Sequence, residues 1–192
     1  METTLRWTSA DLERLPENGK RYEIVDGELL VSKAPHYHHQ FTCGKLFELL
    51  NSWSAQTRLG QPNIGAGIVF ADDDDVIPDV VWTSRERLSQ ILGGDGHFHH
   101  APELVVEVLS FGGANEQRDR ETKLKLYSRR GVEEYWIVNW LIREIEIYRR
   151  KRGRLKQIAT LHATDTLTSP LLPGFKCEVS AIFEDYLAMP QQ

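Results

Sequence analysis

The chain has 192 residues, of which 41% are hydrophobic, so it can bury one core of ordinary size without disulfide bonds or a structural metal. The two cysteines, Cys43 and Cys177, form no CxxC pair, which argues against a zinc ribbon and a disulfide framework and favours the reducing cytoplasm. No apolar run approaches the roughly 18 residues of a membrane span, and acids interrupt residues 1–20, which excludes a signal-peptide core. The sequence predicts one cytoplasmic domain over residues 1–192, with no membrane partner.

Charge is distributed unevenly along the chain. The net charge of −5 argues against a protein that coats nucleic acid through bulk electrostatics. Residues 118–156, however, hold thirteen Lys or Arg against six acids, a local charge of +7 that leaves −12 for the rest. This stretch forms either a face that attracts phosphate or solvated helix and hairpin surfaces, and the sequence leaves both interpretations open.

In the first half of the chain, hydrophobic spacing and turn residues predict two helices and four strands. The pair Asp26-Gly27 is a strong signal for a two-residue hairpin turn. The four aspartates at 72–75 are expected to form a solvated turn rather than a cation site. The predicted elements are a helix at 11–15, a hairpin at 21–32, a helix from His39 that ends before Gly60, and strands at 64–70 and 77–82.

The second half begins with a short helix and a strand of unusual composition. Residues 104–109 are apolar and mostly β-branched apart from Glu107, which suits a strand buried on both faces. The predicted elements are helices at 85–92 and 118–130, the strand at 104–109, strands at 135–139, 144–148 and 155–160, and a closing helix from a Ser180 cap to Leu187. This order predicts an α/β fold with a central mixed β-sheet flanked by helices.

Two acidic residues stand in unusual places. An ionised carboxylate within a buried strand is costly unless it is paired or bound to a metal, which makes Glu107 exceptional. Asp79 follows Pro78 and opens another apolar strand, so the two carboxylates meet if their strands are neighbours. Such a pair repels itself unless a divalent cation lies between, and oxygen ligands suit Mg²⁺ or Mn²⁺. Lys123, on the following helix, can contact a phosphate and orient or deprotonate a water.

Six short segments of the chain match the motifs of a known family. They are residues 22–29, 35–40, 78–80, 103–110, 119–127 and 131–138. In combination they resemble the Uma-type putative restriction endonuclease family of the PD-(D/E)XK nuclease superfamily. The resemblance covers about residues 21–148 and implies a restriction endonuclease-like fold.

The resemblance also implies catalytic roles. Asp79 and Glu107 become the two motif acids, and together with the Val108 carbonyl they are expected to hold Mg²⁺ or Mn²⁺. Leu109 stands where the superfamily has a lysine two residues after the acid. The lysine is therefore expected to have moved to the next helix, as Lys123.

Supporting residues follow from the same resemblance. Lys125 is the fallback for the lysine, and a further acid is expected at Glu28 or Glu23. His39 stands at the family's His-Gln position, where it is expected to cap or orient the first long helix near the site.

The function that the resemblance implies is a metal-dependent DNA endonuclease that acts as a homodimer. The alternative is a non-catalytic module that keeps the nuclease fold and binds nucleic acid or protein. Metal binding would separate these two functions.

The residues considered for function also have structural interpretations. Glu107 and Lys123 could form a buried ion pair, and Tyr135 and Trp136 favour core packing over base stacking. Two histidine clusters favour exposed loops over a zinc site, and the basic run at 149–152 favours a solvated turn over phosphate contacts. The clusters are residues 36–39 and 97–100.

Overall fold

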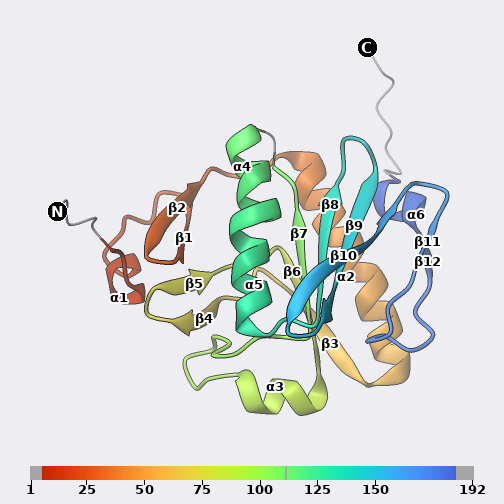
Figure 1. The fold of residues 1–192 in the computed structure, drawn as a ribbon, viewed down its shortest axis with the longest axis horizontal. Coiled ribbons are helices and arrows are strands. Elements are labelled where there is room, and N and C mark those ends of the chain that lie inside the picture. The colour runs from red at the N-terminus through yellow and green to blue at the C-terminus, as the bar shows by residue number, and fades with distance from the viewer. Residues whose placement is uncertain (1–5, 111, 185–192) are drawn as a thin grey trace.

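The computed structural model describes residues 6–110 and 112–184, and its centre is a six-stranded sheet (Figure 1). The strand order is β10-β9-β8-β7-β6-β3, in which β7 and β8 are parallel and all other neighbours are antiparallel. The strands are β3 (Gly60–Ile64), β6 (Val80–Ser84), β7 (Leu104–Val108), β8 (Glu134–Asn139), β9 (Glu144–Lys151) and β10 (Arg154–Leu161). The predicted central mixed sheet is confirmed.

A smaller antiparallel sheet stands beside the first and contains the N-terminal hairpin. Its order is β2-β1-β5-β4, with β1 (Arg21–Val25), β2 (Glu28–Ser32), β4 (Ile68–Ala71) and β5 (Asp74–Val76). Asp26 and Gly27 have φ angles of 53° and 76°, the left-handed backbone that a two-residue type I′ turn requires. The predicted hairpin is therefore confirmed, and the short helix α1 (Ser9–Leu12) precedes it.

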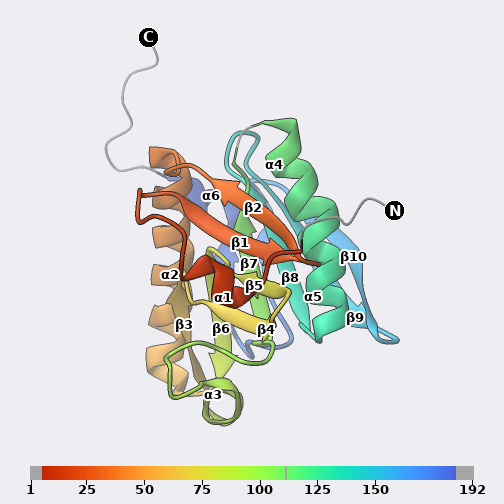
Figure 2. The ribbon, with the colours of Figure 1, turned by 90° about the vertical axis from the view of Figure 1, so that its left-hand side faces the viewer.

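Helices cover both faces of the large sheet (Figure 2). On one face pack α2 (Tyr37–Thr57) and α6 (Val179–Phe183), and on the other α4 (Gly113–Gln117), the π-helical segment η1 (Arg118–Lys123) and α5 (Leu124–Arg130). The remaining elements are α3 (Arg85–Ile91) and the strand pair β11 (Thr166–Leu167) and β12 (Cys177–Glu178). Along the described residues, no helix has the length and apolar character that crossing a membrane requires.

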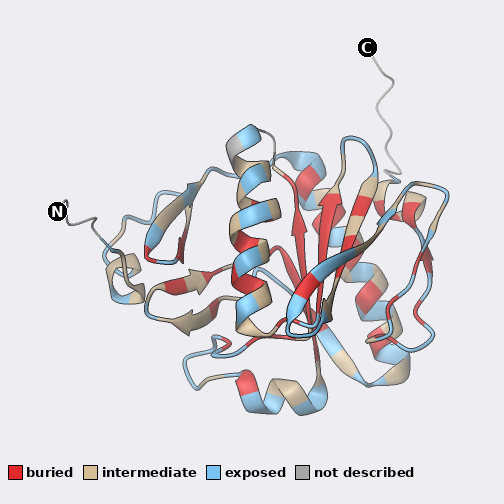
Figure 3. Cartoon of the chain, in the orientation of Figure 1, coloured by how far each residue is buried: buried red, intermediate tan, exposed pale blue. Residues whose placement is uncertain are grey.

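Strand β7 is buried on both sides, as predicted (Figure 3). Val106 and Val108 belong to the core under α2, whereas Val105 belongs to the core under α5. Because successive side chains of a strand point to opposite faces, Glu107 lies on the α5 face. The strand therefore delivers a carboxylate to the helix that carries Lys123.

The predicted charged helix at 118–130 begins earlier than expected. Segments α4, η1 and α5 follow one another without a break, so helical backbone extends from Gly113 to Arg130. It ends as predicted at Gly131, whose φ of 97° closes the helix in the left-handed region. π-Helical insertions such as η1 are frequent at functional sites.

Several predicted boundaries are wrong, among them the start of the strand predicted at 77–82, because β6 begins only at Val80. The strand expected at 64–70 is divided, because the chain turns at Gly65, which has a φ of 63°, and β4 starts only at Ile68. Ser180 lies inside α6 rather than capping it, since that helix begins at Val179. The predicted end of this helix, Leu187, lies outside the described residues.

The four aspartates at 72–75 do not form one solvated turn. Only Asp72 and Asp73 occupy the turn, and Asp74 is buried in β5. The Asp74 carboxylate accepts hydrogen bonds from Arg129 at 2.7 Å and from Arg130. Because both arginines end α5, this aspartate ties the small sheet to the helix on the large sheet.

The basic run at 149–152 contributes largely to the fold. Arg149 pairs with buried Glu134 at 2.8 Å, and Arg150 donates to the carbonyls of Ser128 and Val132 at 2.8 and 2.9 Å. Arg150 thereby satisfies carbonyl groups at the end of α5 that lack helical partners. These contacts favour the structural interpretation for both arginines.

We expect Asp74→Asn to lower the free energy of unfolding by about 2–3 kcal/mol, because it removes charge-assisted bonds to Arg129 and Arg130. The matched control is Asp73→Asn, since Asp73 pairs with exposed Arg6 and should lose less than about 1 kcal/mol. Urea unfolding measures both variants. Equal losses in the two variants would show that the buried ion pairs do not stabilise the junction.

Candidate active site

A cavity of about 700 Å³ opens between the small sheet and one end of the large sheet. Its lining comes from the hairpin β1–β2, the start of α2, the facing ends of β6 and β7, segment η1 and the residue after β8. Five charged side chains in this lining are buried. They are Glu23, Asp79, Glu107, Asp119 and Lys123.

Asp79 is held by three donors at the start of β6. The register of β6 and β7 pairs Val80 with Val106, so Asp79 precedes β6 beside the end of β7. Its Oδ1 accepts a hydrogen bond from Arg21 at 2.9 Å, and its Oδ2 accepts one from the Val108 backbone N–H at 2.9 Å. His39 Nε2 lies 3.2 Å from the same Oδ2. Burial would raise the pKa of Asp79, but His39 and Arg21 outweigh it and hold this pKa well below its usual range.

Glu107 and Lys123 are in direct contact, as both the catalytic and the structural interpretations expect. Lys123 Nζ donates to Glu107 Oε1 at 3.0 Å, and the Tyr127 hydroxyl donates to the same oxygen at 2.7 Å. Burial raises the pKa of Glu107 well above its usual range, although the ammonium opposes this shift. Burial alone would lower the pKa of Lys123, but the surrounding carboxylates raise it. The lysine is therefore an ammonium at neutral pH.

Glu23, rather than Glu28, is the hairpin acid that the structure brings into this group. Glu23 Oε1 lies 2.9 Å from Lys123 Nζ and accepts a hydrogen bond from the Ile77 backbone N–H at 2.9 Å. Glu28 is exposed at the start of β2, next to the hairpin turn, and does not line the cavity. Lys125 is also exposed, because it lies two residues beyond Lys123 on a helix and points to a different side.

Two further residues of the site are not singled out by the sequence. Asp119 is buried one helical turn before Lys123, with its Oδ1 4.0 Å from Nζ. Burial raises the pKa of Asp119 from 3.8 to about 6, against the opposing effect of the ammonium. Arg21 lies two residues before Glu23 in β1, and that period of two is the signal that could have placed it on the same face of the strand.

The oxygen ligands that this group of side chains offers are suited to a divalent cation. Four buried carboxylates surround one ammonium, and the ion pairs of Arg21 and His39 go to Asp79. Burial raises the pKa values of Glu107 and Asp119, and the neighbouring carboxylates raise them further. Carboxylate and carbonyl oxygens are the ligands that Mg²⁺ and Mn²⁺ prefer.

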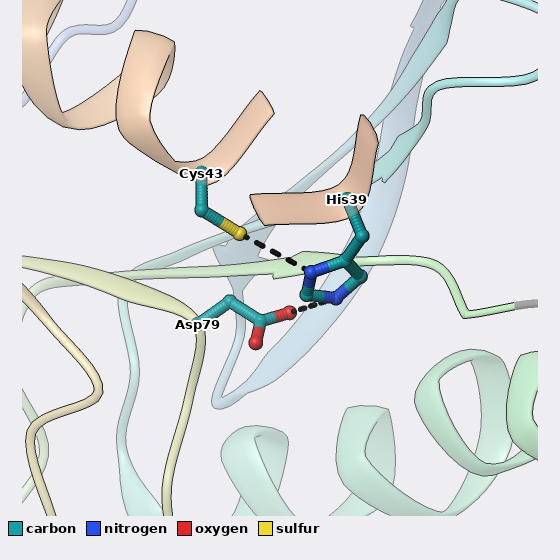
Figure 4. A group of neighbouring side chains, drawn as sticks. All are labelled: His39, Cys43 and Asp79. Carbon is teal, nitrogen blue, oxygen red and sulfur yellow. Dashed lines mark hydrogen bonds and ion pairs between the residues drawn. The ribbon is translucent and has the colours of Figure 1, made fainter. Parts of the chain in front are cut away.

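His39, Cys43 and Asp79 form a second group that could hold a metal, with their ligand atoms within 4.8 Å of one another (Figure 4). His39 uses opposite ring nitrogens, however: Nε2 faces Asp79, and Nδ1 lies 3.6 Å from the Cys43 sulfur. The two contacts therefore use different nitrogens of His39. Burial raises the pKa of the Cys43 thiol, which disfavours the thiolate that a metal binds. The arrangement is better suited to orienting Asp79.

The other histidine cluster lies outside the cavity lining. His97 and His99 are about half exposed, and both face the exposed carboxylate of Asp95 at 3.5 and 3.1 Å. These contacts are the exposed-loop arrangement that the sequence favours over a zinc site.

Comparison with known proteins identifies the family. The model of the Uma2 family, described as putative restriction endonuclease, matches residues 9–180. The chain belongs to the Uma2 family. All residues of the candidate site lie within the matched range, and membership of the Uma2 family supports a nuclease. No curated protein matches the chain.

Solved structures support the fold of this Uma2 chain. The crystal structure of a putative nuclease belonging to DUF820, from Anabaena variabilis, is similar over 92% of this chain and 97% of that chain, with a TM-score of 0.72. At 15% sequence identity, the similarity concerns the fold alone. The predicted restriction endonuclease-like fold is confirmed.

We expect the Asp119 carboxyl to destabilise the metal-free protein above about pH 6. Its pKa is 3.8 ordinarily and about 6 when folded, so the folded chain binds the proton more tightly and stability falls as pH rises through this window. Asp119→Asn should therefore raise the urea midpoint at about pH 7.5 in EDTA, with little effect near pH 4. The control is Glu121→Gln, an exposed acid on the same helix. A lower midpoint for Asp119→Asn at the higher pH would contradict this account.

Proposed function

We propose that the chain is a divalent-metal-dependent endonuclease that hydrolyses DNA phosphodiester bonds. The observation that carries this proposal is the group of buried carboxylates around the Lys123 ammonium in an open cavity. A structural ion pair alone would need one carboxylate for one ammonium. The excess of buried acids is costly without a cation and useful with one.

Asp79, Glu107 and the Val108 carbonyl would hold Mg²⁺ or Mn²⁺. When bound, the ion would polarise the scissile phosphate and lower the pKa of a water. Asp79 suits this role because its low pKa keeps it ionised, and Arg21 and the Val108 N–H fix its orientation. Tyr127 fixes Glu107 in the same way.

Lys123 would orient the attacking water and stabilise the negative charge that develops on the phosphate. Its raised pKa favours the role of hydrogen-bond donor over that of a base. Glu23 and Glu107, at 2.9 and 3.0 Å from Nζ, would hold the ammonium in place. A buried, oriented cation stabilises a transition state more strongly than a mobile surface lysine.

Three further proposals accompany this function: a single domain, a homodimer and a cytoplasmic location. Sedimentation at several protein concentrations would test the dimer independently of catalysis.

We expect Asp79→Ala and Glu107→Gln to lose at least about 100-fold of DNA cleavage in Mg²⁺ or Mn²⁺, because the first removes a carboxylate ligand and the second removes the negative charge of one. The assay compares supercoiled plasmid with single-stranded DNA, and circular dichroism verifies that each variant is folded. If the folded wild type cleaves neither substrate, the non-catalytic module is favoured instead. Full activity in Asp79→Ala would place the reaction elsewhere.

Matched pairs of variants distinguish buried residues of the cavity from exposed residues on the same elements. We expect Glu23→Gln to lose activity and Glu28→Gln to keep it, since the two acids lie on one hairpin but only Glu23 is buried against Lys123. Lys123→Ala should likewise lose activity, whereas Lys125→Ala should not. Cleavage of whichever of the two substrates the wild type cuts measures all four variants. Loss in Glu28→Gln with activity kept in Glu23→Gln would contradict the site.

We expect saturating Mn²⁺ to raise the melting temperature of the wild type by about 5–10 °C but not that of Asp79→Ala, because the ion binds only the folded site. Cys43→Ala is the control for the alternative ligand group and should keep the full shift. Thermal unfolding followed by circular dichroism makes the measurement. A shift that disappears in Cys43→Ala would instead assign the ion to His39, Cys43 and Asp79.

A further inference from the structure

A continuous row of aromatic rings leads away from the cavity. Trp140 and His36, which both line the cavity, stack with centroids 5.0 Å apart. His38 lies 5.5 Å from the His36 ring and 5.3 Å from Tyr37, which in turn stacks on Phe41 at 6.3 Å. We call these five residues the aromatic strip. It extends from the cavity wall along the first turn of α2.

The outer part of the strip is unusually exposed. Tyr37 is 62% exposed, and Leu141 and Ile142, which follow Trp140, are 56% and 59% exposed. Among the large hydrophobic side chains of the described residues, these three are the most exposed. The β8–β9 turn and the start of α2 lie at the same end of the molecule (Figure 1). A gathering of exposed apolar groups beside a cavity indicates a surface that a ligand covers.

The cavity itself restricts the form of the substrate. Asp79, Glu107 and Lys123 expose only 4, 2 and 3% of their surface, so a phosphate must enter the cavity to reach them. A base-paired duplex is stiff over about 150 base pairs, and bending it sharply costs several kcal/mol. A single strand can turn one phosphate inward and splay its bases outward at much lower cost.

Basic side chains also line the cavity. Lys20 and Lys33 are exposed in the lining, and Arg118 joins them, donating to Ser32 across the wall at 2.8 Å. Proteins that bind single strands combine such cations, which follow the phosphates, with aromatic rings on which the bases stack. The charge and the rings therefore fit the same ligand.

We propose that the substrate is a single-stranded segment of DNA, whose bases beside the scissile phosphate stack on the aromatic strip. This inference rests on the proposed nuclease function and specifies its substrate class. Tyr37 is a specificity residue, because it contacts the bases and lies outside the group around Lys123. The rings bind any base, so the strip selects unpaired structure rather than sequence.

The test is fluorescence anisotropy of a labelled single-stranded oligonucleotide and of the same oligonucleotide annealed into a duplex, with Ca²⁺ in place of Mg²⁺ to prevent turnover. The wild type is expected to bind the single strand more tightly than the duplex. Tyr37→Ala should weaken single-strand binding by about 5- to 150-fold, the loss of one base stack. Tyr37→Phe should keep the affinity. Leu92→Ala should keep it too, because Leu92 is an exposed apolar residue that lines a different cavity.

Equal or tighter binding of the duplex, or an unchanged affinity in Tyr37→Ala, would overturn the proposal. Tighter binding of the matching RNA would overturn the assignment to DNA. If Tyr37→Ala instead changes only the sedimentation coefficient, the strip is an interface between subunits and the proposal fails. Metal-dependent cleavage of duplex plasmid that Tyr37→Ala leaves unchanged would refute this inference while preserving the nuclease function. Preferential binding of the single strand that Tyr37→Ala weakens, without cleavage by the wild type, would refute the nuclease function and keep the strip as a single-strand binding surface.

Discussion

The buried ammonium of Lys123 is the interaction on which the rest of the structure depends. It lies 2.9 Å from Glu23 in the small sheet, 3.0 Å from Glu107 in the large sheet and 4.0 Å from Asp119 on its own helix. Removing an ammonium from water is costly unless carboxylates compensate for it. The hairpin, the sheet and the helix must therefore meet at this point, so the same contacts define the fold and the site.

The charges around Lys123 do not balance, and this imbalance links stability to function. Asp79 has its own partners in Arg21 and His39, which leaves the ammonium to serve the remaining acids. Burial, together with the neighbouring carboxylates, raises the pKa values of Glu107 and Asp119. A chain selected for stability alone would gain by replacing one of these acids. Their presence is explained if a divalent cation completes the group, and membership of the Uma2 family agrees with this explanation.

The sequence predicts the parts of the site in which an acid interrupts an apolar strand. Glu107 and Asp79 are conspicuous for this reason, and the hairpin and the mixed sheet follow from turn residues and hydrophobic spacing. Glu23 and Glu28 could not be separated, because the register places both on one face of the hairpin, and only packing against β5 and η1 decides which of them is buried. Asp119 and Asp74 lie among other charged residues, where a polar sequence gives no sign of burial. The arginine partners of Asp74 come from a distant segment.

The central claim is that the metal-free site holds protons that a divalent cation displaces. Calorimetric titration of the wild type with Mn²⁺ at about pH 6, in two buffers of different ionisation enthalpy, tests this claim directly, because metal binding to protonated carboxylates releases protons. The account predicts binding heats that differ between the buffers and show net proton release, arising from Glu107 and Asp119. Identical heats in the two buffers, or no binding by the folded protein, would contradict it.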